Sequence, residues 1–141
     1  MKATELMIGD LVTFKDSQND EAPIVVRIWQ INGADEALVK IDGDEALDEI
    51  EIDDNVVGIP ITAEILKKNG FGYIEKDEQF MLTHYYLGTS RYCKNMDLHI
   101  GTNNSGDYWI NDRRNSLYGL HYVHELQHVL RLWNIEKEIV L

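Results

Sequence analysis

The chain has a single cysteine, Cys93, so it can form neither an intrachain disulfide framework nor an all-cysteine zinc site. No stretch approaches about 18 consecutive apolar residues, which predicts that no helix spans a bilayer. The first ten residues contain no apolar run of about 7–15 residues, which argues against a signal peptide. With these classes excluded, the sequence predicts a cytoplasmic protein.

Basic residues are also few. Lys and Arg number 13 against 25 Asp and Glu in 141 residues, which gives a formal net charge of −12. Nucleic acids and anionic membranes need clustered Lys and Arg on the protein, so we expect neither as a partner. Hydrophobic residues make up 44 % of the chain, enough for a folded core in one domain or two very small ones.

The negative charge is unevenly distributed. Residues 1–60 hold 15 acids and 4 bases (net −11), whereas residues 61–141 hold 10 acids and 9 bases (net −1). Half of residues 35–54 are Asp or Glu, and Lys40 is the only base among them. This change in composition near Pro60 predicts a domain boundary there, with domains 1–60 and 61–141.

The first sixty residues read as short strands joined by tight turns. Apolar residues alternate with polar ones, or run together, in four segments: 11–14 (after the Gly9-Asp10 turn), 24–31, 38–41 and 47–52. Asn32-Gly33 is typical of a type I′ hairpin turn, and Asp42-Gly43 offers a second turn of the same chemistry. Four or five such strands predict a small SH3-like β-barrel in this part of the chain.

The second part reads as a helix-on-antiparallel-sheet unit. Thr62 is expected to be the N-cap and Gly70 the left-handed C′ residue of a short helix over 63–69. Strands are expected at 71–75, 80–87, 96–100 and 108–110, with 139–141 as a last edge strand. The periodicity then predicts an amphipathic helix over 121–134, with one apolar stripe formed by Val123, Leu126, Leu130 and Trp133. The predicted fold class is therefore α+β.

Residues 124–128 read His-Glu-Leu-Gln-His and satisfy the H-E-x-x-H pattern. On a helix, His124 and His128 could bind zinc while Glu125 activates the metal-bound water, and His121 lies one turn earlier. However, Asn134 occupies the position of the third metzincin histidine, and only 13 residues follow His128. This face also lies opposite the apolar stripe, so we expect it to face solvent. The sequence favours a structural helix without a cofactor, and a zinc-dependent hydrolase is the alternative.

The acidic segment offers a second candidate site. Its acids alternate with strand residues and predict a solvated sheet face, which favours a partner protein, and a basic one above all. Trp29 is interpreted either as a core residue or as part of a peptide-binding groove on its strand. The candidate partner-binding residues are Trp29, Asp44, Glu45, Glu49, Glu51 and Asp53.

Three blocks of the sequence resemble a family of small proteins abundant in Bacteroidetes and in their phages or mobile elements. The opening block, 5–12, resembles the family's "ELRIGN-x-V" start, and the middle block, 59–71, resembles "IPLT-x-E-I-L-x-x-x-GF". The third block, 122–128, is similar to the "YVH-[QE]-LQN-L" helix. The family is uncharacterised, so the resemblance implies no activity, cofactor or catalytic residue.

The resemblance does bear on the histidine helix. In the family pattern the position of Glu125 is often Gln and that of His128 is usually Asn, which implies that H-E-x-x-H arose here by chance on a structural helix. His124 and Gln127 match the pattern, and we expect them to make capping or helix-to-sheet hydrogen bonds. The function that this favours is a non-enzymatic interaction or accessory protein, related to phage or mobile-element proteins, that uses its acidic face.

Overall fold

Two units are distinguished in the computed structural model, which describes residues 1–16, 22–33, 35–41, 44–74, 83–88, 96–102, 107–111 and 117–141. The first unit comprises Met1–Pro60 and Tyr122–Val129, and the second comprises Ile61–His121 and Leu130–Leu141. The first sixty residues therefore share a unit with a segment distant in sequence. Separate folding of 1–60 and 61–141 stays a prediction. In the described part of the chain, no helix is long and apolar enough to cross a membrane.

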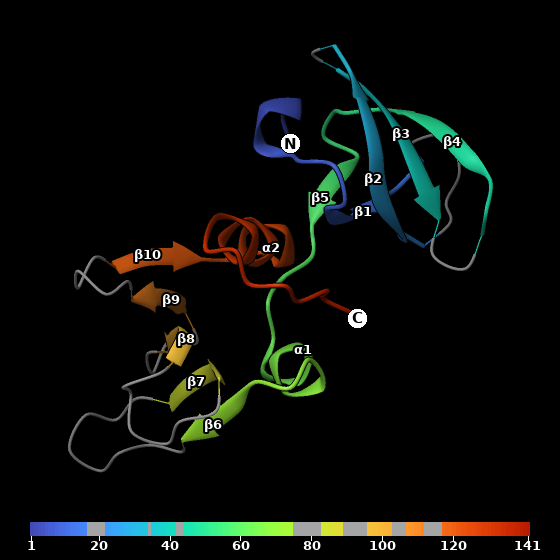
Figure 1. Cartoon of the computed structure of the whole chain (residues 1–141). Coiled ribbons are helices and arrows are strands. Elements are labelled where there is room, and N and C mark those ends of the chain that lie inside the picture. Colours follow the sequence, from blue (N-terminus) through green and yellow to red (C-terminus); the bar gives the residue numbers. More distant parts are fainter. Residues whose placement is uncertain are drawn as a thin grey trace. The chain divides into compact units, whose positions relative to one another are not determined.

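The first unit contains a five-stranded antiparallel sheet that follows a short 3₁₀ helix (Ala3–Glu5). Its strands lie in the order β4-β3-β2-β1-β5 (Figure 1). Their bounds are Leu11–Phe14 for β1, Ile24–Asn32 for β2, Glu36–Ile41 for β3, Leu47–Glu51 for β4 and Val56–Gly58 for β5. Because side chains alternate between the faces of a strand, one face collects the branched apolar residues. This core includes Val12, Val26, Ile28, Val39, Ile50 and Val56.

The predicted strands at 11–14, 24–31, 38–41 and 47–52 are confirmed, but the turn after the second one is not type I′. Gly33 has a positive φ of 73°, whereas Asn32 lies outside the left-handed region and is still part of β2. Asn32 pairs with Glu36, so three residues rather than two connect the strands. The Asp42-Gly43 turn lies outside the described residues.

The predicted α+β class with antiparallel sheets is confirmed, but a closed barrel is not seen. The outer strands of the first sheet are β4 and β5, and they do not pair with each other within the described residues. The sheet is therefore open at both sides in the part of the chain that the structure describes.

The second unit contains another five-stranded antiparallel sheet, with the order β10-β9-β8-β7-β6 (Figure 1). Its strands are β6 (Gly72–Ile74), β7 (Thr83–Gly88), β8 (Met96–Thr102), β9 (Tyr108–Asn111) and β10 (Leu117–Leu120). The first four lie where strands are predicted. The last strand is absent from the prediction, because its four residues carry too short an alternation to stand out. Leu98, Ile100, Ile110 and Leu120 are buried.

The short helix of this unit, α1 (Ala63–Lys68), is capped at both ends as the sequence predicts. Thr62 Oγ1 accepts a hydrogen bond from the Ile65 N–H at 3.2 Å. At the other end, Gly70 adopts φ 77°, and the N–H groups of Gly70 and Phe71 donate to the carbonyls of Lys67 and Leu66. These two bonds form a Schellman motif, and glycine supplies the left-handed residue without a Cβ penalty.

The long helix, α2 (Val123–Leu132), is shorter than predicted at both ends, and His121 precedes it. Asn134 adopts a left-handed φ of 55°, and the Ile135 N–H donates to the Leu130 carbonyl, which closes a second Schellman motif. Trp133 therefore falls in the cap rather than in the helical stripe and is 38 % exposed. The other three stripe residues, Val123, Leu126 and Leu130, are buried as predicted.

The C-terminal residues 139–141 are not an edge strand, contrary to the prediction. Asn69, which is buried, holds this segment with its side chain: Nδ2 donates to the Val140 carbonyl at 2.7 Å, and Oδ1 accepts from the Val140 N–H at 2.9 Å. Lys68 Nζ donates to the Leu141 carbonyl. A carboxamide mimics a backbone partner here, so an extended end is fixed without a neighbouring strand.

Candidate functional site

Glu125, the acid of the H-E-x-x-H sequence, caps the N-terminus of helix α2. Glu125 is the third residue of the helix, and its Oε2 accepts a hydrogen bond from the Tyr122 N–H at 3.0 Å. This is the carboxylate half of a capping box, and a negative charge in the first turn also favours the helix dipole. Glu125 therefore has a structural partner, while its alternative role as a water-activating base stays a prediction.

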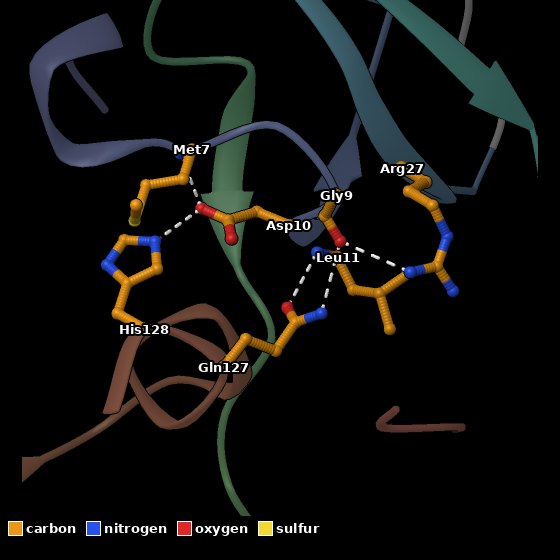
Figure 2. A network of polar contacts seen from close by, with 7 residues as sticks. All are labelled: Met7, Gly9, Asp10, Leu11, Arg27, Gln127 and His128. Carbon is orange, nitrogen blue, oxygen red and sulfur yellow. Dashed lines mark hydrogen bonds and ion pairs between the residues drawn. The ribbon is translucent and has the colours of Figure 1, made fainter. Parts of the chain in front are cut away.

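The second histidine of the pattern is bound to a buried carboxylate. His128 Nε2 donates to Asp10 Oδ2 at 2.6 Å, and the same oxygen accepts from the Met7 N–H at 2.7 Å (Figure 2). Asp10 is completely buried, whereas the His128 side chain is 22 % exposed. Burying a carboxylate costs free energy unless it is hydrogen-bonded or paired with a cation. The bonds from His128 and the Met7 amide offset this cost for Asp10.

Between the two histidines, Gln127 joins the helix to the start of the first sheet. Its Oε1 accepts from the Leu11 N–H at 2.9 Å, and its Nε2 donates to the Gly9 carbonyl at 3.1 Å (Figure 2). The Gly9 carbonyl also accepts from Arg27 Nη1 at 3.2 Å. Gln127 is only 6 % exposed. The expected helix-to-sheet hydrogen bonds are confirmed for this residue.

The first histidine is buried, which corrects the expectation that this helix face meets solvent. His124 is 5 % exposed; its ring stacks on Tyr122 with centroids 5.6 Å apart and meets the His128 ring edge-on at 5.7 Å. The helix is buried both along its apolar stripe and on the side of His124 and Gln127. The apolar stripe in the sequence does not predict the burial of the His124 and Gln127 side, because aromatic rings and a carboxamide make the contacts there.

Burial also governs the acid–base behaviour of His124. Desolvation lowers the pKa of its imidazole, and the nearby carboxylate of Asp10 opposes that effect. Its Nδ1 is buried and has no hydrogen-bond partner within the described residues. The expected capping or helix-to-sheet hydrogen bond of His124 is therefore not found at this nitrogen.

The residues of the candidate zinc site differ in their burial and in their partners. Glu125 and His128 have the partners described above, and the exposed His121 belongs to the second unit. Within the described ranges, no three His, Cys, Asp or Glu side chains come close enough together to hold a metal ion.

Asp10 is the residue that sequence reasoning missed. In the sequence it is only the second residue of a Gly-Asp turn, and 118 positions separate it from His128. Turn chemistry explains why an Asp stands there, but no local pattern indicates a partner so far along the chain.

The candidate acidic face lies on one side of the first sheet and around its outer strand. Glu49 and Glu51 are exposed on β4, and Asp44 and Glu45 are exposed in the segment before it. Asp53 follows β4, is partly buried, and accepts from the Asn55 N–H at 2.8 Å, so it also fixes a turn. These residues all belong to the first unit, and their role in partner binding stays a prediction.

Trp29 lies in the middle of this sheet rather than in the core. The register of β2 against β3 shifts between Ile28 and Gln30, which is the irregularity of a β-bulge. Trp29 follows the buried Ile28 and points to the opposite, outer face, where its side chain is 51 % exposed and Lys40 Nζ lies 5.6 Å from its ring centroid. The shift instead places Ile31 opposite the buried Ala37. The interpretation of Trp29 as a core residue is therefore wrong, and its part in a peptide-binding groove stays a prediction.

Comparison of the chain with protein-family models, with curated proteins and with solved structures finds no significant match.

Proposed function

We propose that this chain is a non-enzymatic interaction protein that binds a basic partner protein through its acidic face. The observation that carries the proposal is the outer side of β4, where Leu47, Glu49 and Glu51 are exposed. Trp29, also exposed, adds a large aromatic side chain to the same unit. Exposed aromatic side chains are enriched at protein-binding surfaces.

The unpaired charges of this face favour one kind of partner. Neither Glu49 nor Glu51 has a hydrogen bond or ion pair with any described residue, so both carboxylates are available to cations. Such charges raise the association rate of an oppositely charged protein and suppress acidic partners. A basic protein is therefore the partner that this surface favours.

The experiment compares two doubly substituted proteins that lose the same charge. Glu49→Gln with Glu51→Gln removes two carboxylates from the acidic face, whereas Glu64→Gln with Glu136→Gln removes two exposed carboxylates from the second unit. Proteins captured from the native host are identified, and the affinity of the purified pair is measured. At about 0.2–1 kcal/mol per exposed charge, we expect the first variant to bind about 2- to 30-fold more weakly, and less so at high salt. Equal binding by both variants contradicts the proposal.

The alternative function, a zinc-dependent hydrolase using His124, Glu125 and His128, is tested on the same protein purified without a histidine tag. One tightly held zinc per chain, lost on His128→Ala but retained on His121→Ala, would support a metal site and contradict the non-enzymatic proposal. The structure supplies a competing role for His128, which is its bond to Asp10.

We also infer that the first sheet is an open relative of SH3-like barrels. Four strands form a meander and the fifth returns beside the first, so closure requires only that β4 meets β5. Nuclear Overhauser contacts between these strands would show a closed barrel and would contradict an open sheet. The relationship to small proteins of Bacteroidetes, phages or mobile elements stays a prediction, and the genes beside this one would test it.

A further inference from the structure

Strand β4 forms an open edge of the first sheet. It pairs with β3 on one side, and no strand of the described chain pairs with its other side (Figure 1). Its five residues, Leu-Asp-Glu-Ile-Glu, include neither Pro nor Lys, which proteins often use to protect exposed edges. The edge instead carries three acids and no base. Charge repulsion therefore disfavours pairing of this edge with another acidic strand, whereas a basic strand can pair with it.

The register shows which backbone groups face the open side. Asp35 lies opposite Ile52, and the Ile52 N–H donates to the Asp35 carbonyl at 2.6 Å. In an antiparallel pair, every second residue makes such bonds, so Ile50 and Asp48 also bond to β3. The N–H and C=O groups of the intervening residues, Leu47, Glu49 and Glu51, consequently point away from β3 into the open edge.

The same three residues present their side chains on the outer face of the sheet. Leu47 is 43 % exposed and both glutamates are exposed, whereas Ile50, on the opposite face, is buried in the core. A strand added at this edge would thus meet backbone partners and outward side chains at the same three positions. Residues placed directly opposite Leu47, Glu49 and Glu51 would share their face.

Existing repulsion on this face points to a cationic ligand. Glu36 on β3 lies directly opposite Glu51, and both side chains are exposed. Like charges at directly opposed positions destabilise a sheet, and neither carboxylate has a basic partner among the described residues. A Lys or Arg opposite Glu51 on an added strand would reduce this repulsion. A second copy of the same strand would increase it.

We propose that an extended segment of the partner adds to β4 as an antiparallel strand, with Lys or Arg at alternate positions opposite Glu51 and Glu49 and an apolar residue opposite Leu47. Main-chain hydrogen bonds would supply affinity, and the alternating side chains would supply selectivity. This inference rests on the proposed function and deepens it, because it names the binding mode and the sequence pattern of the ligand.

The first test uses two synthetic peptides of identical composition, both blocked at their ends. One reads Thr-Lys-Thr-Lys-Thr-Val-Thr, and the control, Thr-Lys-Lys-Thr-Thr-Val-Thr, places its lysines on opposite faces of a strand. At a concentration ten times its Kd, the alternating peptide should slow amide hydrogen exchange at Leu47, Glu49 and Glu51 about elevenfold. The control peptide should bind several-fold more weakly. N-methylation at the lysines, whose amides face β4, should reduce binding at least tenfold, whereas N-methylation at the threonines between them should not.

The second test changes the protein. Glu49→Pro removes an N–H group that faces the open edge and leaves the bonds between β4 and β3 intact, since those use Asp48 and Ile50. Glu49→Gln removes the same charge but keeps the N–H group. We expect Glu49→Gln to weaken peptide binding about 1.4- to fivefold, and Glu49→Pro to weaken it at least tenfold further. Equal binding by the two variants, with both folded by circular dichroism, overturns strand addition.

The remaining outcomes separate this inference from the proposed function. If both peptides bind equally and no edge amide is protected, strand addition is wrong, while binding by the acidic face stands. If neither peptide binds, strand addition is also overturned, and the proposed function is judged by the charge variants and the natural partner. Concentration-dependent protection of the same amides without peptide would identify a second copy as the occupant, which also contradicts the proposal.

Discussion

Gln127 offers the sharpest test of how the first unit is held together. It is a buried side chain that satisfies two backbone groups at the start of β1, the N–H of Leu11 and the carbonyl of Gly9. Gln127→Met keeps an unbranched side chain of similar length but removes both hydrogen bonds. Packing is therefore largely preserved, and the change isolates the polar contribution.

The expected magnitude follows from what each partner loses. Leu11 is 4 % exposed, so water cannot readily replace the lost acceptor, and leaving a buried N–H unpaired costs about 1–3 kcal/mol. The Gly9 carbonyl keeps its hydrogen bond from Arg27, so the second loss costs only about 1 kcal/mol. We therefore expect Gln127→Met to lower the free energy of unfolding by about 2–4 kcal/mol.

The assay is urea denaturation at neutral pH combined with hydrogen exchange at the Leu11 amide. An opening free energy lower by 2 kcal/mol would accelerate that exchange about thirtyfold. Gln30→Met is the matched control, because Gln30 is exposed on β2, and it should change stability by less than about 0.5 kcal/mol. Gln127→Met within 0.5 kcal/mol of the wild type would refute the reasoning.

A second variant, Gln127→Glu, gives a signature that packing cannot imitate. The substituted carboxylate can accept from the Leu11 N–H, but it places a negative oxygen beside the Gly9 carbonyl, 3.1 Å from the present nitrogen. Burial and this repulsion raise the folded-state pKa of the new carboxyl above its unfolded value of about 4.3. The destabilisation relative to wild type is therefore full above the folded pKa and vanishes as the pH falls below about 4.3. A difference independent of pH would contradict this account.

Three further predictions concern other sites. Burial lowers the pKa of His124, so protonation of this residue opposes folding. The free energy of unfolding should therefore fall as the pH drops through about 6.5, by at most about 1.4 kcal/mol per pH unit. His124→Phe should remove this part of the pH dependence of unfolding. A Cβ at Gly58 would lie 2.5 Å from Tyr122 Cγ, so Gly58→Ala should cost about 1–3 kcal/mol in thermal or urea unfolding, and a neutral result would show that the ring moves aside freely. Asn69→Ala removes both bonds to Val140 and should accelerate exchange of the Val140 amide at least tenfold while leaving the Leu11 amide unchanged.

The local structure was largely predictable, and particular residues show why. Thr62 and Gly70 cap α1 as expected, because N-caps and left-handed C′ residues depend only on neighbouring atoms. The strands over 24–31 and 38–41 follow from alternation, which is likewise local. The predicted type I′ turn was wrong because Asn32 pairs with Glu36, which leaves three residues between the strands. That pairing depends on both strands together and not on the turn residues alone.

The candidate site was less predictable, because its chemistry depends on contacts across the chain. The sequence identifies His124, Glu125 and His128 as a group, yet the structure gives Glu125 a capping role and binds His128 to Asp10. The spacing of side chains on a helix is local information. The carboxylate or amide that each of them meets is determined by how distant segments fold together.

The sequence by itself determined the elements, the α+β class and the placement of nearly all the net charge in the first sixty residues, because propensity, periodicity and charge are properties of neighbouring residues. Only the tertiary structure decided that residues 122–129 belong with those sixty, that Trp29 is exposed and not a core residue, and that β4 is an open edge in the described chain. Each of these depends on which strands and side chains become neighbours in space. That choice is made by the burial and hydrogen bonding of the whole unit, as at Asp10 and Gln127, and no short stretch of sequence contains it.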